Sequence, residues 1–299
     1  MARAESRVPA GLSQGAAAYL ALAERGRSDG WRYLPGLALI VACWLFAGGW
    51  LFGVVAAGGW FGDLNEFVSI NASLWPLLLA VLLVLPALHG RGLSSLIAPD
   101  GIDWLRIMRG AVLWMLFAAL AMVVENLMYP GRYRWIYDAA QWWPMLFTAL
   151  LLTPLQCLAE ELFFRGYLIQ AMGRLSTRPM VIAVLSSVLF TLPHLLNPEV
   201  AAYGMAIMAV NYFAMGLLLA LCTLRDGRLE LAIGAHAGNN LLLAAGVSYE
   251  GSVFRTPALW SSGALDPVYS LITLLIGGML FYFWFFGRSS WTIAFQNRK

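Results

Sequence analysis

The chain has 299 residues, of which 61% are hydrophobic and only 12% are charged. Its mean hydropathy is +0.72. Soluble domains carry about a quarter charged residues, so the composition excludes an ordinary soluble protein and an intrinsically disordered one. The formal net charge is +3, and the basic residues are not gathered on a soluble region, so no nucleic acid is expected as a partner. The composition is typical of a multi-pass membrane protein.

The expected membrane spans are the stretches that contain no Asp, Glu, Lys or Arg, because such a charge at mid-bilayer costs about 2.5 to 3.5 kcal/mol. There are eight such stretches: residues 33–62, 67–90, 110–124, 139–159, 179–198, 200–224, 231–249 and 267–287. The third has 15 residues and is long enough only if Arg106 and Arg109 snorkel at one end and Glu125 lies near the other. We therefore predict an all-α transmembrane helix bundle with about eight spans.

The loop charges predict the orientation of the chain, since cytoplasmic loops carry the excess of Lys and Arg. With the amino terminus inside, the inner segments hold 15 basic residues and the outer loops hold three, Arg132, Arg134 and Arg255. We expect a cell (inner) membrane protein with a cytoplasmic segment at 1–32, one transmembrane domain at 33–287 and a cytoplasmic tail at 288–299. A short interfacial helix is expected within residues 11–25.

One strongly polar run interrupts the fourth apolar element, from Gln156 to Gly166. Glu161 and Arg165 are four residues apart, so on a helix they share a face and can pair. Glu160 points about 100° away and has no cation nearby in the sequence. Ionisable groups within a bilayer are costly and often mark a functional site, and a desolvated carboxylate suits general acid–base chemistry.

Three histidines occur, and two of them lie inside apolar segments. His89 sits beside Gly90-Arg91 at an inner boundary and is interpreted as an interfacial residue. His194 follows Phe190 by four residues, and His236 precedes Asn240 by four, so each pair shares a helix face. The small residues around His236 favour the close approach of another helix. No disulfide framework or metal-binding spacing is found among the three cysteines.

The depths of these polar residues agree with one another. Counted from the nearest inner arginine at about 1.5 Å per residue, Glu160 lies about 21 Å deep and His194 about 24 Å deep. His236 and Asn240 lie about 12 and 18 Å deep. The alternative interpretation is that each group only forms a hydrogen bond between helices. A shared depth across three helices favours one site, which we expect to open towards the cytoplasmic half of the bilayer.

Three motifs occur together, each on an apolar helix: Glu-Glu-x-x-x-Arg at 160–165, Phe-x-x-x-His at 190–194 and His-x-x-x-Asn at 236–240. In this order they resemble the CAAX protease and bacteriocin-processing (CPBP, or Abi) family of intramembrane proteases. The resemblance covers about residues 142–247, the four-helix catalytic core of that family.

The resemblance implies an endopeptidase whose residues Glu160 and His194 activate a water molecule, while His236 and Asn240 stabilise the oxyanion. Glu161, Arg165 and Phe190 would support the site. The substrate would be a peptide or protein reached within the lipid bilayer. No metal or other cofactor is favoured, although Glu160, His194 and His236 could bind a divalent ion such as zinc with water as the fourth ligand.

Two other functions remain open from the sequence. A non-catalytic CPBP-like scaffold or bacteriocin-immunity protein would share the architecture. A small-solute transporter could also use buried Glu and His, but the sequence shows no internal repeat or matched pair of broken helices.

Overall fold

The computed structural model describes residues 14–296, with side chains as far as Gly287. The parts of the predicted terminal segments outside 14–296 are therefore outside the described residues. The elements follow one another in this order: α1 (Gln14–Ala21), η1 (Leu22–Arg25), α2 (Gly30–Ala42), η2 (Cys43–Gly48), α3 (Gly49–Gly58), η3 (Gly62–Leu64), α4 (Asn65–Ala72), α5 (Trp75–His89), α6 (Ser94–Ile97), α7 (Trp104–Met128), β1 (Arg134–Trp135), α8 (Ala139–Glu161), η4 (Leu162–Leu168), α9 (Ile169–Met172), α10 (Pro179–His194), α11 (Pro198–Tyr203), α12 (Met205–Asp226), α13 (Glu230–Leu241), η5 (Leu242–Gly246), β2 (Val247–Ser248), β3 (Trp260–Ser261) and α14 (Pro267–Gln296).

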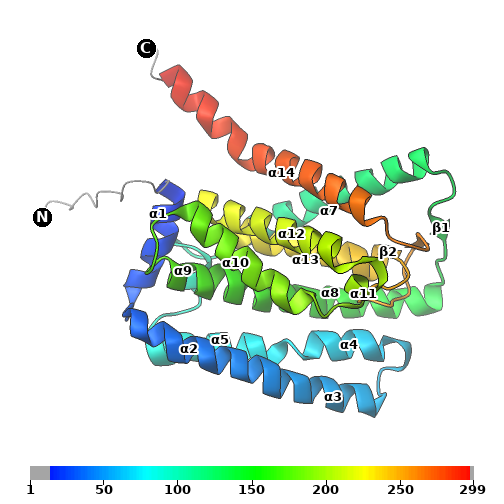
Figure 1. Ribbon diagram of the computed structural model, residues 1–299, viewed down its shortest axis with the longest axis horizontal. Helices are drawn as coiled ribbons and strands as arrows, with labels where there is room; N and C mark the ends of the chain where they lie inside the picture. Colours follow the sequence, from blue (N-terminus) through cyan, green and yellow to red (C-terminus); the bar gives the residue numbers. More distant parts are fainter. Residues whose placement is uncertain (1–13, 297–299) are drawn as a thin grey trace, which may run out of the picture.

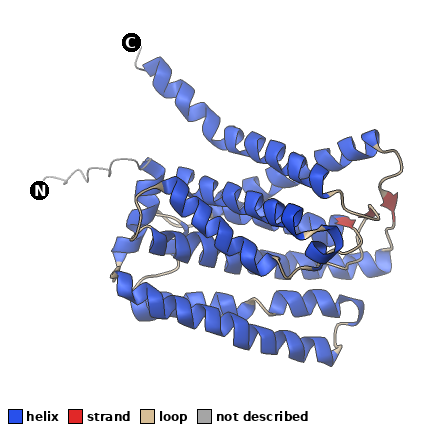
Figure 2. Cartoon of the chain, viewed as in Figure 1, coloured by secondary structure: helices blue, strands red, loops and turns tan. Residues whose placement is uncertain are grey.

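The fold is an all-α bundle, as predicted (Figure 2). Six helical segments are long and apolar enough to cross a membrane: Gly30–Gly58, Gly62–His89, Trp104–Met128, Ala139–Met172, Met205–Asp226 and Pro267–Gly287. The other two predicted spans are shorter helices, α10 and α13 with η5. Proline closes α10, since Pro193 lies in its last turn and Pro198 starts α11.

The helices are arranged in layers (Figure 1). α2 to α5 form one layer, α8, α10, α12 and α13 form the central group, and α7 and α14 cover the opposite side. Within the central region α13 packs on α7 and α8, and α10 packs on α12. The three short strands form a small sheet in the order β1-β3-β2 at one end of the bundle, with β1 antiparallel and β2 parallel to β3.

The third predicted span is longer in the structure than its charge-free stretch, because charged residues at both ends of α7 are paired. Arg106 donates to Asp226 at the end of α12, over 2.5 Å. At the other end Glu125 is bonded to Arg132, over 3.1 Å. The helix begins where Asp103 Oδ1 accepts a hydrogen bond from the Arg106 amide. The Arg106–Asp226 pair therefore brings two of the predicted inner segments together at one end of the bundle.

The predicted helix within 11–25 is present as α1 and η1, and it is anchored in the bundle. Tyr19 is fully buried, and its hydroxyl lies 2.5 Å from the Leu96 carbonyl oxygen and 3.1 Å from that of Arg165. His89, which we interpreted as interfacial, is also fully buried and lies 3.1 Å from the Tyr167 hydroxyl through Nε2. Its Nδ1 contacts the Arg27 carbonyl oxygen at 3.0 Å, so it joins this terminal segment to the bundle.

Candidate active site

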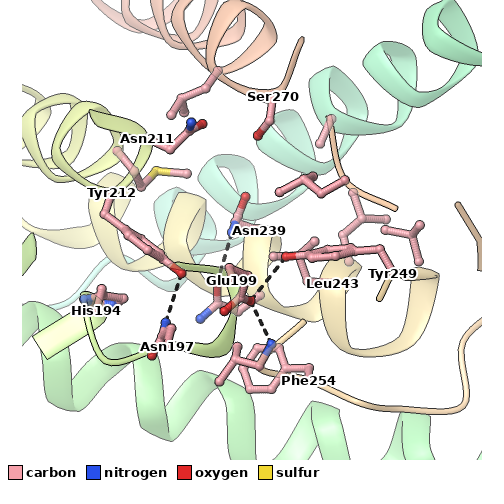
Figure 3. Close-up of a pocket in the computed structure, with 18 of the residues that line it drawn as sticks. His194, Asn197, Glu199, Asn211, Tyr212, Asn239, Leu243, Tyr249, Phe254 and Ser270 are labelled. Atoms are coloured by element: carbon pink, nitrogen blue, oxygen red, sulfur yellow. Dashed lines mark hydrogen bonds between the residues drawn. The ribbon is translucent and has the colours of Figure 1, made fainter. Parts of the chain in front are cut away.

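The predicted residues meet inside the bundle. Five of the seven line a cavity of about 440 Å³: Glu160, Phe190, His194, His236 and Asn240. They come from α8, α10 and α13, which are far apart in the sequence and adjacent in the central group. Figure 3 shows His194 at one edge of this cavity and Asn239 within it. The other two residues, Glu161 and Arg165, are fully buried behind the cavity wall.

Glu160 and His194 face each other. His194 Nε2 lies 3.7 Å from Glu160 Oε2, which is wider than a direct hydrogen bond. One water molecule placed to the side of the pair can form hydrogen bonds to both atoms. His194 Nδ1 lies 2.7 Å from the Phe190 carbonyl oxygen, which can only accept, so Nδ1 carries the proton. In the neutral ring Nε2 is therefore the free acceptor. Glu160 Oε1 accepts a hydrogen bond from Gln156 Nε2 at 3.1 Å, which fixes the carboxylate.

Glu161 holds the second histidine. His236 Nδ1 donates to Glu161 Oε1 over 2.8 Å, and Arg165 Nη1 donates to the same oxygen over 2.8 Å. All three side chains are 5% exposed or less, so the carboxylate compensates a guanidinium that has lost its water. Arg165 also reaches across to the Gly216 carbonyl oxygen on α12. The adjacent glutamates thus have different positions: Glu160 lines the cavity, whereas Glu161 is buried behind its wall.

Asn240 completes a chain of hydrogen bonds that begins on α7. Trp114 Nε1 donates to Asn239 Oδ1 over 3.1 Å, and Asn239 Nδ2 donates to Asn240 Oδ1 over 3.1 Å. Asn240 Nδ2 then lies 3.4 Å from His236 Nε2. This places Asn240 next to the histidine, as the four-residue spacing predicted, and gives Asn239 the role of orienting it. An Asn amide has two N–H groups, so one remains for a ligand in the cavity.

Phe190 packs at the centre of these groups. Its ring centroid lies 4.3 Å from that of His194 and 5.9 Å from that of His236. The Arg165 guanidinium carbon lies 4.0 Å from the Phe190 ring centroid, a cation–π contact. Gly216 makes this packing fit, because a Cβ there would lie 3.2 Å from the Phe190 ring. The Phe190 ring therefore lies between the Glu161–Arg165 ion pair and the cavity.

The small residues around His236 allow α7 to approach α13 closely, as the sequence predicted. A Cβ on Gly234 would lie 2.1 Å from the Ile107 carbonyl oxygen, and one on Gly238 would lie 2.5 Å from that of Ala111. Real Cβ atoms do not tolerate such distances, so larger side chains would push the helices apart. The contact brings Trp114 within reach of Asn239.

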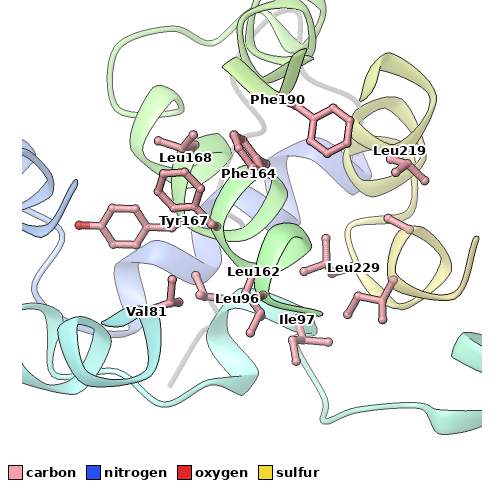
Figure 4. Close-up of a cluster of buried hydrophobic side chains, with 14 of the residues drawn as sticks. Val81, Leu96, Ile97, Leu162, Phe164, Tyr167, Leu168, Phe190, Leu219 and Leu229 are labelled. Atoms are coloured by element: carbon pink, nitrogen blue, oxygen red, sulfur yellow. The ribbon is translucent and has the colours of Figure 1, made fainter. Parts of the chain in front are cut away.

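The turn that follows the two glutamates is held by the main apolar core. This turn, η4, is a π-helix, and π-helical turns are frequent at functional sites. Figure 4 shows its side chains Leu162, Phe164, Tyr167 and Leu168 among buried residues of neighbouring elements. The core therefore fixes the helix on which Glu160, Glu161 and Arg165 are placed.

The cavity does not extend in the direction that we expected. It reaches the connections that carry Arg132, Ser262 and Asp266, at the same end of the bundle as the small sheet. The Arg106–Asp226 pair of the opposite end does not line it. The charge bias assigns the Arg132 connection to the outside, so the expected opening towards the cytoplasmic half is wrong for this orientation. The ends of α7 and α14 nearest the small sheet, with the connections that carry Arg132 and Asp266, line this part of the cavity, which we call the mouth.

Three residues of this region were not among the predicted ones. Gln156 binds Glu160 and lies four residues before it, so the helical spacing could have identified it. Trp114 is 125 residues from its partner Asn239. Glu199 on α11 lines the cavity but lies in a short connection where a charged residue is unremarkable in sequence. Of these three residues, only Gln156 could have been identified from the sequence.

The arrangement of the ring nitrogens does not suit the alternative zinc site. His236 uses Nδ1 for Glu161 and presents Nε2 to Asn240, so neither nitrogen has a free lone pair directed at Glu160 and His194. Within residues 14–287 no three His, Cys, Asp or Glu side chains are grouped closely enough to hold a metal ion.

Comparison with known proteins agrees with the geometry. Residues 139–242, which contain all seven predicted site residues, match the family described as type II CAAX prenyl endopeptidase Rce1-like. This part of the chain is similar to that family. The match confirms the resemblance to the CPBP family of CAAX proteases, and the apolar helices agree with a multi-pass membrane protein of a protease family.

A relative matches most of the chain. The uncharacterized protein YyaK of Bacillus subtilis (strain 168) is 28% identical over 276 residues, which cover 86% of this chain and 91% of the relative. No solved structure matches the chain. The likeness to YyaK therefore extends beyond the Rce1-like core into the flanking helices.

Proposed function

We propose that the chain is an intramembrane endopeptidase that hydrolyses a peptide bond of a membrane-associated or C-terminal-tail substrate. The observation that carries the proposal is the approach of His194 Nε2 to Glu160 Oε2, 3.7 Å apart in a cavity within the bundle. The volume of that cavity falls in the usual range of ligand pockets. The Rce1-like match supports a protease rather than a transporter.

In the proposed reaction a water molecule between Glu160 and His194 attacks the peptide carbonyl carbon. The carboxylate and the free His194 Nε2 are both acceptors, so they hold the water by its hydrogens and leave an oxygen lone pair for attack. One proton passes to this pair as the new C–O bond forms. The same proton then goes to the amide nitrogen as the C–N bond breaks, giving a carboxylic acid and an amine. The acid then passes the second proton of the water to the amine, so the products leave as a carboxylate and an ammonium group.

The negative charge that develops on the carbonyl oxygen needs a donor, and we assign it to Asn240. Its amide is aimed by Asn239 and is next to His236. Donors placed before the reaction stabilise an oxyanion strongly in a site without bulk water. His236 supports Asn240 through its Nε2, which lies 3.4 Å from Asn240 Nδ2, while its Nδ1 is held by Glu161.

We also propose that this reaction needs no metal, because the His236 nitrogens are engaged by Glu161 and Asn240. The arginine asymmetry supports a cell-membrane location with both termini cytoplasmic. In that orientation the cavity opens towards the outer side of the bilayer. Its partners would be the lipid and a peptide or protein substrate.

The test compares the ends of membrane peptides in cells that carry wild type, Glu160→Gln or His194→Ala. The control is Glu24→Gln, the same chemical change at a glutamate whose side chain is 66% exposed, in η1. We expect peptide ends that depend on both Glu160 and His194 and persist in the control. Identical ends in all four strains would refute the endopeptidase and favour the non-catalytic scaffold or immunity protein.

A further inference from the structure

The cavity contains a second carboxylate that the proposed reaction does not use. Glu199, the second residue of α11, is 2% exposed and lines the cavity. Its Oε1 accepts hydrogen bonds from the Val253 amide over 2.7 Å and from the Tyr249 hydroxyl over 3.3 Å. Figure 3 shows Glu199 between Tyr249 and Asn197 in the cavity wall. The carboxylate is thus fixed from two sides.

The other oxygen of this carboxylate has no partner. Glu199 Oε2 is buried and makes no hydrogen bond to any residue in the described part of the chain. The Tyr212 hydroxyl accepts a hydrogen bond from Asn197 Nδ2 at 3.0 Å. Its own proton is therefore free to interact with the Glu199 carboxylate beside it. An unpaired buried polar atom is costly, so a donor supplied by a ligand would relieve that cost.

The charges around the cavity indicate the sign of that ligand. The cavity lining contains four carboxylates and, among the described residues, one guanidinium, Arg132. Arg132 is already bonded to Glu125 over 3.1 Å. Asp266 Oδ1 accepts from two amides at the start of α14. Within residues 14–287, Glu199 is therefore the carboxyl group of the outer cavity that is buried without a cationic partner and has an acceptor oxygen open to a ligand.

We propose that Glu199, with Tyr249 and Tyr212, forms a specificity subsite for a Lys or Arg side chain of the substrate. This inference rests on the proposed endopeptidase function. An ammonium or guanidinium donating to Oε2 would form a charge-assisted hydrogen bond, one of the stronger kinds. The tyrosine rings offer further stabilisation for a cation.

The chain connectivity limits where that basic residue lies in the substrate. Glu199 follows His194 by five residues, so their backbones are at most about 17 Å apart. An extended substrate advances about 3.3 Å per residue. The basic side chain is therefore expected within about five residues of the bond that is cleaved, in the part of the substrate that extends from His194 towards Glu199.

The experiment measures binding separately from cleavage. The full chain carrying Glu160→Gln, in detergent, is titrated with two fluorescent 15-residue Ala/Ser/Leu peptides that differ only by Lys or Met three residues from the centre. We expect the Lys peptide to bind at least about tenfold more tightly, as for one charge-assisted hydrogen bond. Glu199→Gln should remove the preference, and Asp266→Asn, a matched change at another cavity carboxylate, should keep it.

Equal affinity for the Lys and Met peptides in the protein with Glu199 intact would overturn the subsite. This result does not depend on whether the Glu199→Gln variant folds. A preference that survives Glu199→Gln would overturn it as well. Cleavage is then scored with wild type. Absence of cleavage together with a Glu199-dependent Lys preference would refute the endopeptidase and retain the cation subsite.

Discussion

The same substitution at the two adjacent glutamates of α8 should lower stability at Glu161 and leave it nearly unchanged at Glu160. Glu161→Gln removes the charge that compensates Arg165, whose side chain is 0% exposed and bonded to Glu161 over 2.8 Å. Leaving one member of a buried pair without its partner costs about 3 to 5 kcal/mol. The change also weakens the hydrogen bond that orients His236. Both stability and activity should fall.

Glu160→Gln should affect activity alone. The amide oxygen of the new side chain can still accept from Gln156 Nε2, as Oε1 does now over 3.1 Å. No buried cation depends on Glu160, since its other neighbour is His194 across 3.7 Å. The free energy of unfolding should therefore change by no more than about 1 kcal/mol, while the peptidase loses its base.

The assay is the free energy of unfolding of each purified variant in mixed detergent micelles, measured beside the wild type. The double variant Glu161→Leu/Arg165→Met removes both charges and should recover most of the lost stability, because an apolar pair can replace a buried ion pair. Equal losses for Glu160→Gln and Glu161→Gln, or no recovery in the double variant, would refute the division of roles.

Three further outcomes follow from the packing and the hydrogen bonds. Gly234→Ala, whose Cβ would meet the Ile107 carbonyl oxygen at 2.1 Å, should cost about 1 to 3 kcal/mol of stability. The control is Gly277→Ala, where a Cβ would lie 3.8 Å from its nearest atom, and it should leave the free energy of unfolding unchanged in the same assay. An unchanged free energy for Gly234→Ala would contradict the close helix contact. Trp114→Phe removes the donor to Asn239 and should lower kcat about tenfold with KM unchanged, a split that steady-state kinetics can test. A chelator should leave cleavage intact, and loss of activity that zinc restores would show that the metal-free proposal is wrong.

Much of the fold could be predicted because the bilayer penalises charge so heavily. Each of the eight charge-free stretches corresponds to a helical segment of the structure. The helical spacing correctly placed Asn240 beside His236 and Glu161 beside Arg165. These are local relations between residues four apart, and they follow from the geometry of one helix.

The long-range part of the site could not be predicted from these spacings. Glu161 meets His236 across 75 residues, and the charge-free stretches do not say which helices are neighbours. The direction of the cavity depends on the loops at its mouth, which carry no periodic pattern. Glu199 gained its importance from its burial, its place in the cavity and its unpaired oxygen. The sequence of a six-residue helix with one charged residue does not reveal these properties.

The anchoring of α1 has a practical consequence for handling this protein. Tyr19 contacts the carbonyl oxygen of Arg165, so the amino-terminal helix supports the turn that carries the buried ion pair. A shortened chain that begins after Tyr19, or a bulky fusion placed against α1, would disturb that support while leaving every proposed site residue in place. Purification tags and reporter fusions are therefore better attached after α14, and loss of activity in an amino-terminally trimmed protein should not be taken as evidence about the chemistry.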